Sequence, residues 1–184
     1  MRVIIGAGEQ RWDGWTATQR DELDLTDPAS FERYFGAGQA DALLCEHVWE
    51  HLSVEQGWAA ARLCFRFLRP GGRLRVAVPD GLHPDPAYQQ VVQVGGPGPA
   101  DHPAADHQVL YDHRSFVPLF EQAGFRVRRL EWWDEAGVLH TRRWAMQDGP
   151  VYRSVPLDHR NARYREGTGP AGFTSLILDA LKPE

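Results

Sequence analysis

The sequence has few cysteines and no long apolar segment. Only two cysteines, Cys45 and Cys64, occur among 184 residues, and both stand in apolar surroundings. This placement favours buried free thiols in a reducing cytoplasm over a disulfide or a metal site. No run of about 18 apolar residues occurs, which excludes a transmembrane helix. The start, "MRVIIGAG", lacks the apolar region of a signal peptide and is expected to form a first strand.

Positive charge is not in excess. The formal net charge is −5, and no basic stripe with interleaved aromatic residues occurs, which argues against a nucleic-acid partner. Charge is unevenly spread, because the N-terminal third is acidic and residues 126–165 are rich in arginine. That polarity would suit a cationic ligand near the N-terminal part and an anionic one near the C-terminal part, or it is simply solvated surface.

A helix is missing after the first glycine-rich turn. A β-branched run leads into Gly6-Ala7-Gly8, the pattern of a buried strand that ends in a tight turn. A dinucleotide needs a third glycine and a helix N-terminus for its pyrophosphate, and the sequence supplies neither before a second predicted strand at 15–19. The turn therefore disfavours NAD. Bare backbone at Gly6 and Gly8 lets another ligand lie close, and the alternative is a plain turn.

Strands and helices alternate along the rest of the chain, which predicts an α/β fold with a mainly parallel sheet. The last two strands have no helix between them and are expected to pair antiparallel. A single domain over 1–184 is expected, with 81–111 and 134–170 as lid or substrate loops. The predicted strands are 3–5, 15–19, a short one at 23–25, 41–45, 73–80, 125–133 and 174–181, and the predicted helices are 28–35, 54–68, 87–94 and 112–125.

Capping residues and spacing set the details of the helices. Asp27 before Pro28 predicts one helix start, and Ser53 with Gln56 forms a capping box at another. The helix near 112 starts at Asp112 or Ser115, and Pro118 favours the later start. The apolar stripe expected on the helix at 54–68 consists of Val54, Trp58, Ala61, Phe65 and Leu68.

Several motifs carry a family resemblance. The glycine turn, "CEHVWEHL" and "LRPGGRLRVAVPD" resemble the class I S-adenosylmethionine (SAM)-dependent methyltransferases. The segments "GPGPADH", "HQVLYD", "DGPVYRS", "DHRN" and "TSLILDALKP" resemble a group of small predicted methyltransferases that begin directly at strand one. The resemblance implies a Rossmann-like methyltransferase sheet without the N-terminal helix and the helix after strand one. It also implies SAM as the cofactor, and SAM carries no phosphate.

The resemblance also implies the cofactor residues. Gln19 occupies the position where the family usually has an acidic residue for the ribose hydroxyls, and Asp24 matches an adenine-amine acceptor. The cap or turn role remains the alternative for Asp24. The expected cofactor contacts are Gly6, Ala7, Gly8, Gln19, Asp24, Leu25, Glu46 and His47.

Catalytic and substrate residues are expected after the strands and in the long loops. A general base is needed only if the acceptor arrives protonated, and the candidates are His47, Asp80, His107 and Tyr111. An arginine pair could hold an anionic acceptor, and the expected substrate contacts are His107, Tyr111, Tyr152, Arg153, Arg160 and Asn161. A metal site could also be formed by His102, Asp106, His107 and His113. The spacing of these residues matches no familiar zinc motif, so no metal is predicted.

The sequence thus predicts a cytoplasmic SAM-dependent methyltransferase that acts on an oxygen or nitrogen of a small polar molecule. Anionic acceptors, sugars and natural-product intermediates are the candidates. One alternative is a non-catalytic methyltransferase-fold subunit that assists a partner enzyme, and another is an enzyme that uses SAM for other chemistry. Fewer helices than a doubly wound sheet needs predict an under-covered sheet face, and hence a homodimer.

Overall fold

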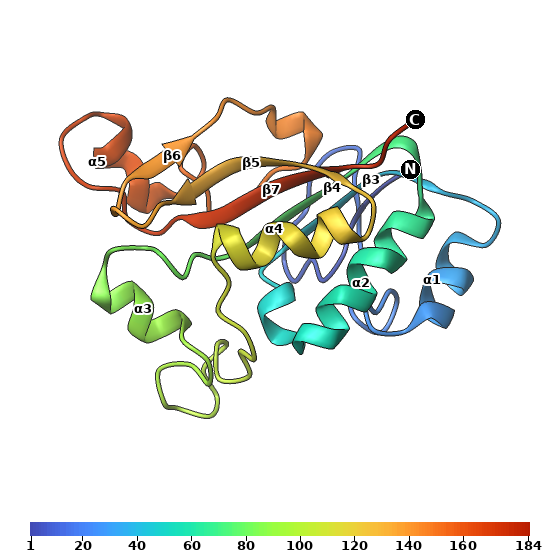
Figure 1. The fold of residues 1–184 in the computed structure, drawn as a ribbon, viewed down its shortest axis with the longest axis horizontal. Helices are drawn as coiled ribbons and strands as arrows, with labels where there is room; N and C mark the ends of the chain where they lie inside the picture. The colour runs from blue at the N-terminus through green and yellow to red at the C-terminus, as the bar shows by residue number, and fades with distance from the viewer.

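A seven-stranded sheet runs through the middle of the structure, a computed structural model that describes residues 1–184 (Figure 1). Its order is β2-β1-β3-β4-β7-β5-β6. The first four strands pair in parallel, and β7 pairs antiparallel with both β4 and β5. The strands are β1 (Arg2–Ile4), β2 (Thr16–Ala17), β3 (Ala40–Glu46), β4 (Leu68–Pro79), β5 (Arg126–Trp133), β6 (Leu139–Thr141) and β7 (Ser175–Leu181). The predicted α/β fold class is confirmed, including the antiparallel last strand and the absence of a helix after β1.

Three helices cover one face of the sheet: α1 (Pro28–Phe35), α2 (Val54–Phe67) and α4 (His113–Gln122) (Figure 1). Alternate residues of the central strands point to this face, and they form one core with Phe31, Trp49 and Phe116. The capping box of Ser53 and Gln56 at the start of α2 is present as predicted. Two short helices lie outside this layer, α3 (Pro86–Val92) and α5 (Ala162–Arg165). None of the helices is long and apolar enough to span a membrane.

The apolar stripe predicted for α2 is partly wrong. Val54 is exposed and Trp58 is only partly buried, whereas Gly57, Ala60 and Cys64 face the core. A Cβ at Gly57 would lie 3.2 Å from Oη of Tyr111, so the small residues let the helix approach its neighbours closely. Hydrophobic spacing alone favours the largest side chains and misses a face built from small ones.

Two other local predictions fail. Helix α4 begins after Asp112 despite Pro118, because the Asp112 carboxylate accepts hydrogen bonds from Arg114 N and Ser115 N and so caps the earlier start. Residues 23–25 do not form a strand: Leu23 and Asp24 have no regular structure, and Leu25 begins a turn with Thr26. There Oδ1 of Asp24 accepts hydrogen bonds from the backbone and hydroxyl of Thr26, which stabilises a turn in place of a strand.

The other face of the sheet carries no long helix, yet the chain covers it with its own loops. A second apolar cluster joins Ile4, Leu44 and Ile177 of the sheet to Trp15 and Val151. The segment that follows β6 crosses this side of the sheet (Figure 1). The argument for a homodimer from an uncovered face is thereby weakened, and the dimer stays a prediction.

Glu131 makes stability on this face depend on pH. Its carboxylate is 1% exposed and accepts hydrogen bonds from Trp144 Nε1 and Val155 N. Burial raises its pKa from 4.5 to about 7 against the effect of those bonds. The folded chain therefore binds the Glu131 proton more tightly than the unfolded chain does. Protonation of Glu131 thus stabilises the fold at low pH, and this stabilisation is lost as pH rises from about 4.5 to 7.

We therefore expect Glu131→Gln to gain stability relative to the parent chain as pH rises through that window, by on the order of 3 kcal/mol. Urea unfolding at several pH values between about 4 and 8 measures the difference. Glu121→Gln, at an exposed position on α4, is the control and should run parallel to the parent chain. A constant difference between Glu131→Gln and the parent chain would contradict this assignment.

Candidate functional site

The turn after β1 leaves an open strip of backbone. Gly6 and Gly8 have positive φ values of 64° and 53°, which favour glycine. A Cβ at Gly6 would lie 2.7 Å from Cγ2 of Val48, whereas a Cβ at Gly8 would meet nothing within 4 Å. The chain therefore packs closely at Gly6 and opens to a hollow at Gly8.

His47 stands at the carboxyl end of β3 in an uncommon conformation. Its φ is 54°, and it is the only residue other than glycine with a positive φ. Such strain is retained where the surroundings enforce it, and it clusters at functional sites. Nε2 of His47 lies 2.9 Å from Oγ of Ser175, and Nδ1 lies 3.1 Å from Oε1 of Glu50. The imidazole thus lies between the hydroxyl of Ser175, to which it is hydrogen-bonded, and the buried carboxylate of Glu50.

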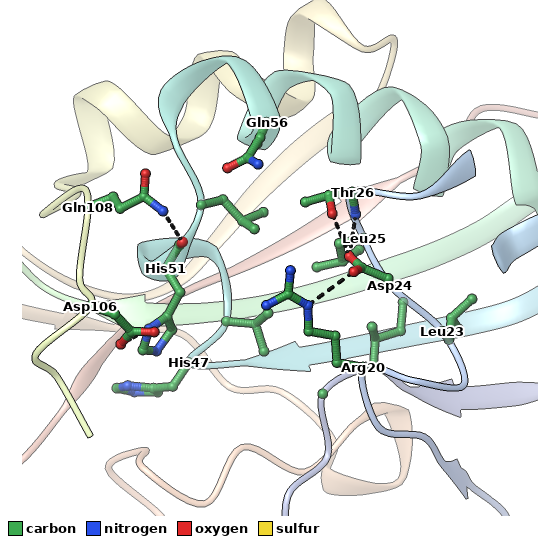
Figure 2. A pocket seen from close by; sticks show the side chains of 14 residues that line it. Arg20, Leu23, Asp24, Leu25, Thr26, His47, His51, Gln56, Asp106 and Gln108 are labelled. Carbon is green, nitrogen blue, oxygen red and sulfur yellow. Dashed lines mark hydrogen bonds and ion pairs between the residues drawn. The ribbon is translucent and has the colours of Figure 1, made fainter. Parts of the chain in front are cut away.

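Three hollows meet at His47. The first, of about 350 Å³, extends over Asp24 and Leu25 toward α2 (Figure 2). The second, of about 570 Å³, is lined by Gly6, Ala7, Gly8, Glu9, Gln10, Glu46, His47, Tyr152 and Arg153. The third, of about 250 Å³, includes His47, Glu50, His51, His102, His107 and Arg153 in its wall. They lie at the carboxyl ends of parallel strands, the edge at which open α/β sheets bind ligands.

Asp24 supplies a fixed carboxylate to the first hollow. Oδ2 pairs with Nε of Arg20 at 3.0 Å, and Oδ1 accepts the two bonds from Thr26 (Figure 2). Burial alone would raise the pKa of Asp24, but these partners hold it below its usual value. Leu25 is 4% exposed and forms an apolar wall beside it. The hollow therefore offers one anionic acceptor next to apolar surface.

Gln19 lies outside the hollows. Its Nε2 donates to the carbonyl oxygen of Gly8 at 2.8 Å, so the side chain braces the glycine turn. The predicted ribose contact through Gln19 is therefore not supported by its position. Arg20 occupies the wall of the first hollow instead.

Glu46 joins the glycine turn to a distant loop. Its carboxylate accepts the backbone N–H groups of Tyr152 and Arg153 at 2.9 and 2.8 Å, and the amide of Gln10. Oη of Tyr152 donates to the carbonyl of Arg11. The Arg153 guanidinium has no carboxylate partner and lies at the border of the second and third hollows. This loop thus brings an unpaired positive charge to the site.

His107 enters the third hollow from the long loop before α4. It is 7% exposed, and its Nδ1 lies 2.9 Å from the carbonyl oxygen of Val92. A carbonyl only accepts, so Nδ1 carries the proton and Nε2 keeps its lone pair. Burial lowers the pKa of His107, which favours this neutral form.

Asp80 and Tyr111 do not reach the site. Asp80 is 0% exposed, and its carboxylate accepts the backbone N–H groups of Leu82 and Trp133, which ties the end of β4 to β5. Burial raises the pKa of Asp80 to about 6. Tyr111 is 3% exposed and packs against Phe116 in the main core. Neither lines a hollow described above, so their positions do not support the predicted catalytic roles.

Arg160 and Asn161 brace their own loop. The Arg160 guanidinium holds the carboxylate of Asp158 through Nε and Nη2 at 2.9 and 2.5 Å. Asn161 is 0% exposed, donates to the carbonyls of Ser154 and Phe173, and accepts from Gly172 N. Neither residue lines a hollow described above, and most of their polar atoms bind inside the loop, so their positions do not support the predicted substrate contacts.

Several residues that line the hollows were not among the predicted site residues. Glu50 and His51 repeat the pair Glu46-His47 four residues later, in a 3₁₀ turn over Trp49–His51. That repeat in "EHVWEH" was the signal that could have found them. Asp106 and Gln108 line the first hollow from the loop before α4 (Figure 2). No local sequence pattern predicts that this loop lies against the hollow.

No family model matches the chain, and no curated protein matches it. The fold is similar to that of solved methyltransferases. A SAM-dependent methyltransferase from Archaeoglobus fulgidus is 14% identical with a TM-score of 0.55, over 98% of this chain and 86% of that one. An O-methyltransferase family protein from Burkholderia thailandensis is 11% identical with a TM-score of 0.51, over 92% of this chain and 36% of that one.

The SAM-dependent methyltransferase SibL, in its apo form, is 14% identical with a TM-score of 0.51, over 100% of this chain and 43% of that one. The chain therefore spans less than half the length of two of these three proteins. At such identities the likeness shows the fold, which is the Rossmann-like fold of SAM-dependent methyltransferases.

Proposed function

We propose that the chain binds SAM where the three hollows meet and transfers its methyl group to an oxygen or nitrogen of a small polar acceptor. The observation that carries the proposal is the position of His47, which lines all three hollows at the carboxyl edge of the sheet. The methyltransferase fold supports the same reading.

The residues present fit SAM in two respects. The open backbone at Gly8 leaves room that a side chain would fill, and the first hollow pairs a carboxylate with an apolar wall. Asp24 and Leu25 would hold the adenine end, and Gly6, Ala7, Gly8, Glu46 and His47 would surround the methionyl end. Gln19 is the exception, since it contributes to the shape of the turn rather than to a ribose contact.

Positioning accounts for most of the catalysis in this proposal. Methyl transfer is an in-line displacement, and holding the two reactants in line can contribute about 7–11 kcal/mol. An acceptor that arrives protonated needs a base, and His47 and His107 are the two predicted bases that reach the hollows. The segments 81–111 and 134–170 would wall the acceptor side. Tyr152 and Arg153 both line the second hollow, and the unpaired guanidinium of Arg153 favours an anionic acceptor such as a carboxylate or phosphate ester.

The test is incubation of the purified chain with SAM labelled in its methyl group and a panel of small acceptors. Label should appear in a product in amounts equal to the S-adenosylhomocysteine formed. Consumption of SAM without a methylated product would favour the alternative in which SAM serves other chemistry. A folded chain that binds no SAM would favour the non-catalytic subunit.

Asp24→Asn should weaken SAM binding by about tenfold, because it removes the charge from the acceptor in the first hollow while retaining its size. Calorimetric titration measures the change. Asp21→Asn is the matched control, since Asp21 is exposed nearby and does not line the hollow. Equal effects of the two substitutions would place the adenine end elsewhere.

A further inference from the structure

Two histidines and a glutamate gather in the third hollow. One potential ligand atom from each of Glu50, His51 and His107 lies within 4.8 Å of the other two. The rings of His51 and His107 meet edge to face, with centroids 4.8 Å apart. These residue types are the donors that proteins use for divalent transition metals.

In both histidines Nδ1 already has a hydrogen-bond partner. Nδ1 of His51 lies 2.7 Å from Oδ1 of Asp106, and Nδ1 of His107 lies 2.9 Å from the carbonyl oxygen of Val92. In each ring the acceptor fixes the proton on Nδ1 and leaves the lone pair on Nε2. Metal-binding histidines are oriented in the same way, through a carboxylate or a backbone carbonyl.

Glu50 provides a second, independent observation. It is 1% exposed, and neither of its carboxylate oxygens accepts a hydrogen bond. Nδ1 of His47 lies 3.1 Å from Oε1 but without the geometry of a hydrogen bond. A buried carboxylate without hydrogen bonds is costly unless a cation accompanies it. Since Glu50 lines the third hollow, this cation would lie in that hollow.

Backbone contacts hold the cluster together. The carbonyl oxygen of Glu50 accepts the N–H groups of Gln108 and Val109 at 2.7 and 3.2 Å. Nε2 of Gln108 also donates to the carbonyl of His51 (Figure 2). The loop that carries His107 is thereby fixed against the turn that carries Glu50 and His51, as a preorganised site requires.

We propose that Glu50, His51 and His107 bind one divalent transition-metal ion, for which zinc is the probe. Bonds of about 2.0–2.1 Å require each donor to move inward by less than about 1 Å, which side-chain rotation allows. Three protein ligands leave a coordination position open toward the hollow. If the proposed methyl transfer is correct, on which this last step rests, the ion would hold an acceptor hydroxyl and lower its pKa.

Titration of the chelator-treated chain with zinc chloride tests the proposal. We expect one ion per chain, with affinity reduced more than about tenfold by Glu50→Gln and by His107→Ala. His159→Ala is the control, because the His159 side chain is 92% exposed and lines none of the three hollows, and it should bind zinc like the parent chain. Absence of zinc binding by the parent chain, or unchanged binding by Glu50→Gln, would overturn the proposal.

Two readouts keep the result interpretable. Glu50→Gln retains the shape of the side chain and removes a buried charge, so its metal-free form should melt no lower than the metal-free parent chain. SAM titration of the metal-free parent chain separates this proposal from the proposed function. SAM binding without zinc binding refutes only the metal site, and zinc binding without SAM binding refutes only the cofactor.

Discussion

Gly8→Arg should reduce the affinity for SAM by at least about 100-fold, which corresponds to about 2.7 kcal/mol. A Cβ at Gly8 meets nothing within 4 Å and opens onto the second hollow, so an arginine there would occupy the space proposed for the methionyl end. The positive φ of 53° adds roughly 1–2 kcal/mol of backbone strain.

The strain needs its own control, and Gly14 supplies it. Gly14 also has a positive φ, of 77°, and a Cβ there likewise meets nothing within 4 Å. It lines none of the three hollows. Gly14→Arg should therefore destabilise the chain to a similar extent and leave SAM binding intact, as measured by thermal unfolding and calorimetry. Equal loss of SAM binding in both variants would show that strain alone accounts for the effect.

Arg75→Met should lower the free energy of unfolding by about 3–5 kcal/mol. Arg75 is 1% exposed, and Nε and Nη2 hold the carboxylate of Asp179 on β7 at 2.7 and 2.9 Å. Nη1 donates to the carbonyls of Ala145 and Gly149. Removal of the guanidinium leaves the buried carboxylate of Asp179 and the carbonyl of Gly149 without their donors, whereas the carbonyl of Ala145 keeps the N–H group of Asp148. This removal also loosens the loop that leads to Arg153 in the site.

Urea unfolding measures this loss against two comparisons. Arg33→Met breaks an exposed pair with Asp27 and should change stability by less than about 1 kcal/mol. The double variant Arg75→Met with Asp179→Leu removes both buried charges and should recover part of the loss. A single variant as stable as the parent chain would show that the pair does not hold the loop on the sheet.

Local chemistry explains which parts of the fold the sequence could predict. The capping box at Ser53 and the buried run of β3 act within one element, so they are readable without a tertiary structure. The face of α2 is different, because Gly57 faces the core only through the approach of Trp49 and Tyr111. The strand expected at 23–25 does not form either, because the hydrogen bonds that Asp24 accepts from Thr26 stabilise a turn there.

The site divides in a similar way. The glycine turn follows β1 and the Glu46-His47 pair stands at the end of β3, so strand order alone places both at one edge of the sheet. Whether a polar residue near that edge faces the hollow depends on its partners, which the sequence does not reveal. The carboxylate of Asp80 accepts two backbone N–H groups, and the side-chain amide of Asn161 makes all its hydrogen bonds inside a loop. The guanidinium of Arg153, in contrast, has no carboxylate partner and faces the hollows.

The most direct test of the account is calorimetric titration of the purified chain with SAM and with S-adenosylhomocysteine. The account predicts that both bind at one site per chain with dissociation constants in the micromolar range, about −8 kcal/mol. Absence of binding to either ligand, by a chain shown to be folded, would contradict it. The three hollows at His47 would then belong to a protein that keeps the methyltransferase fold without its cofactor.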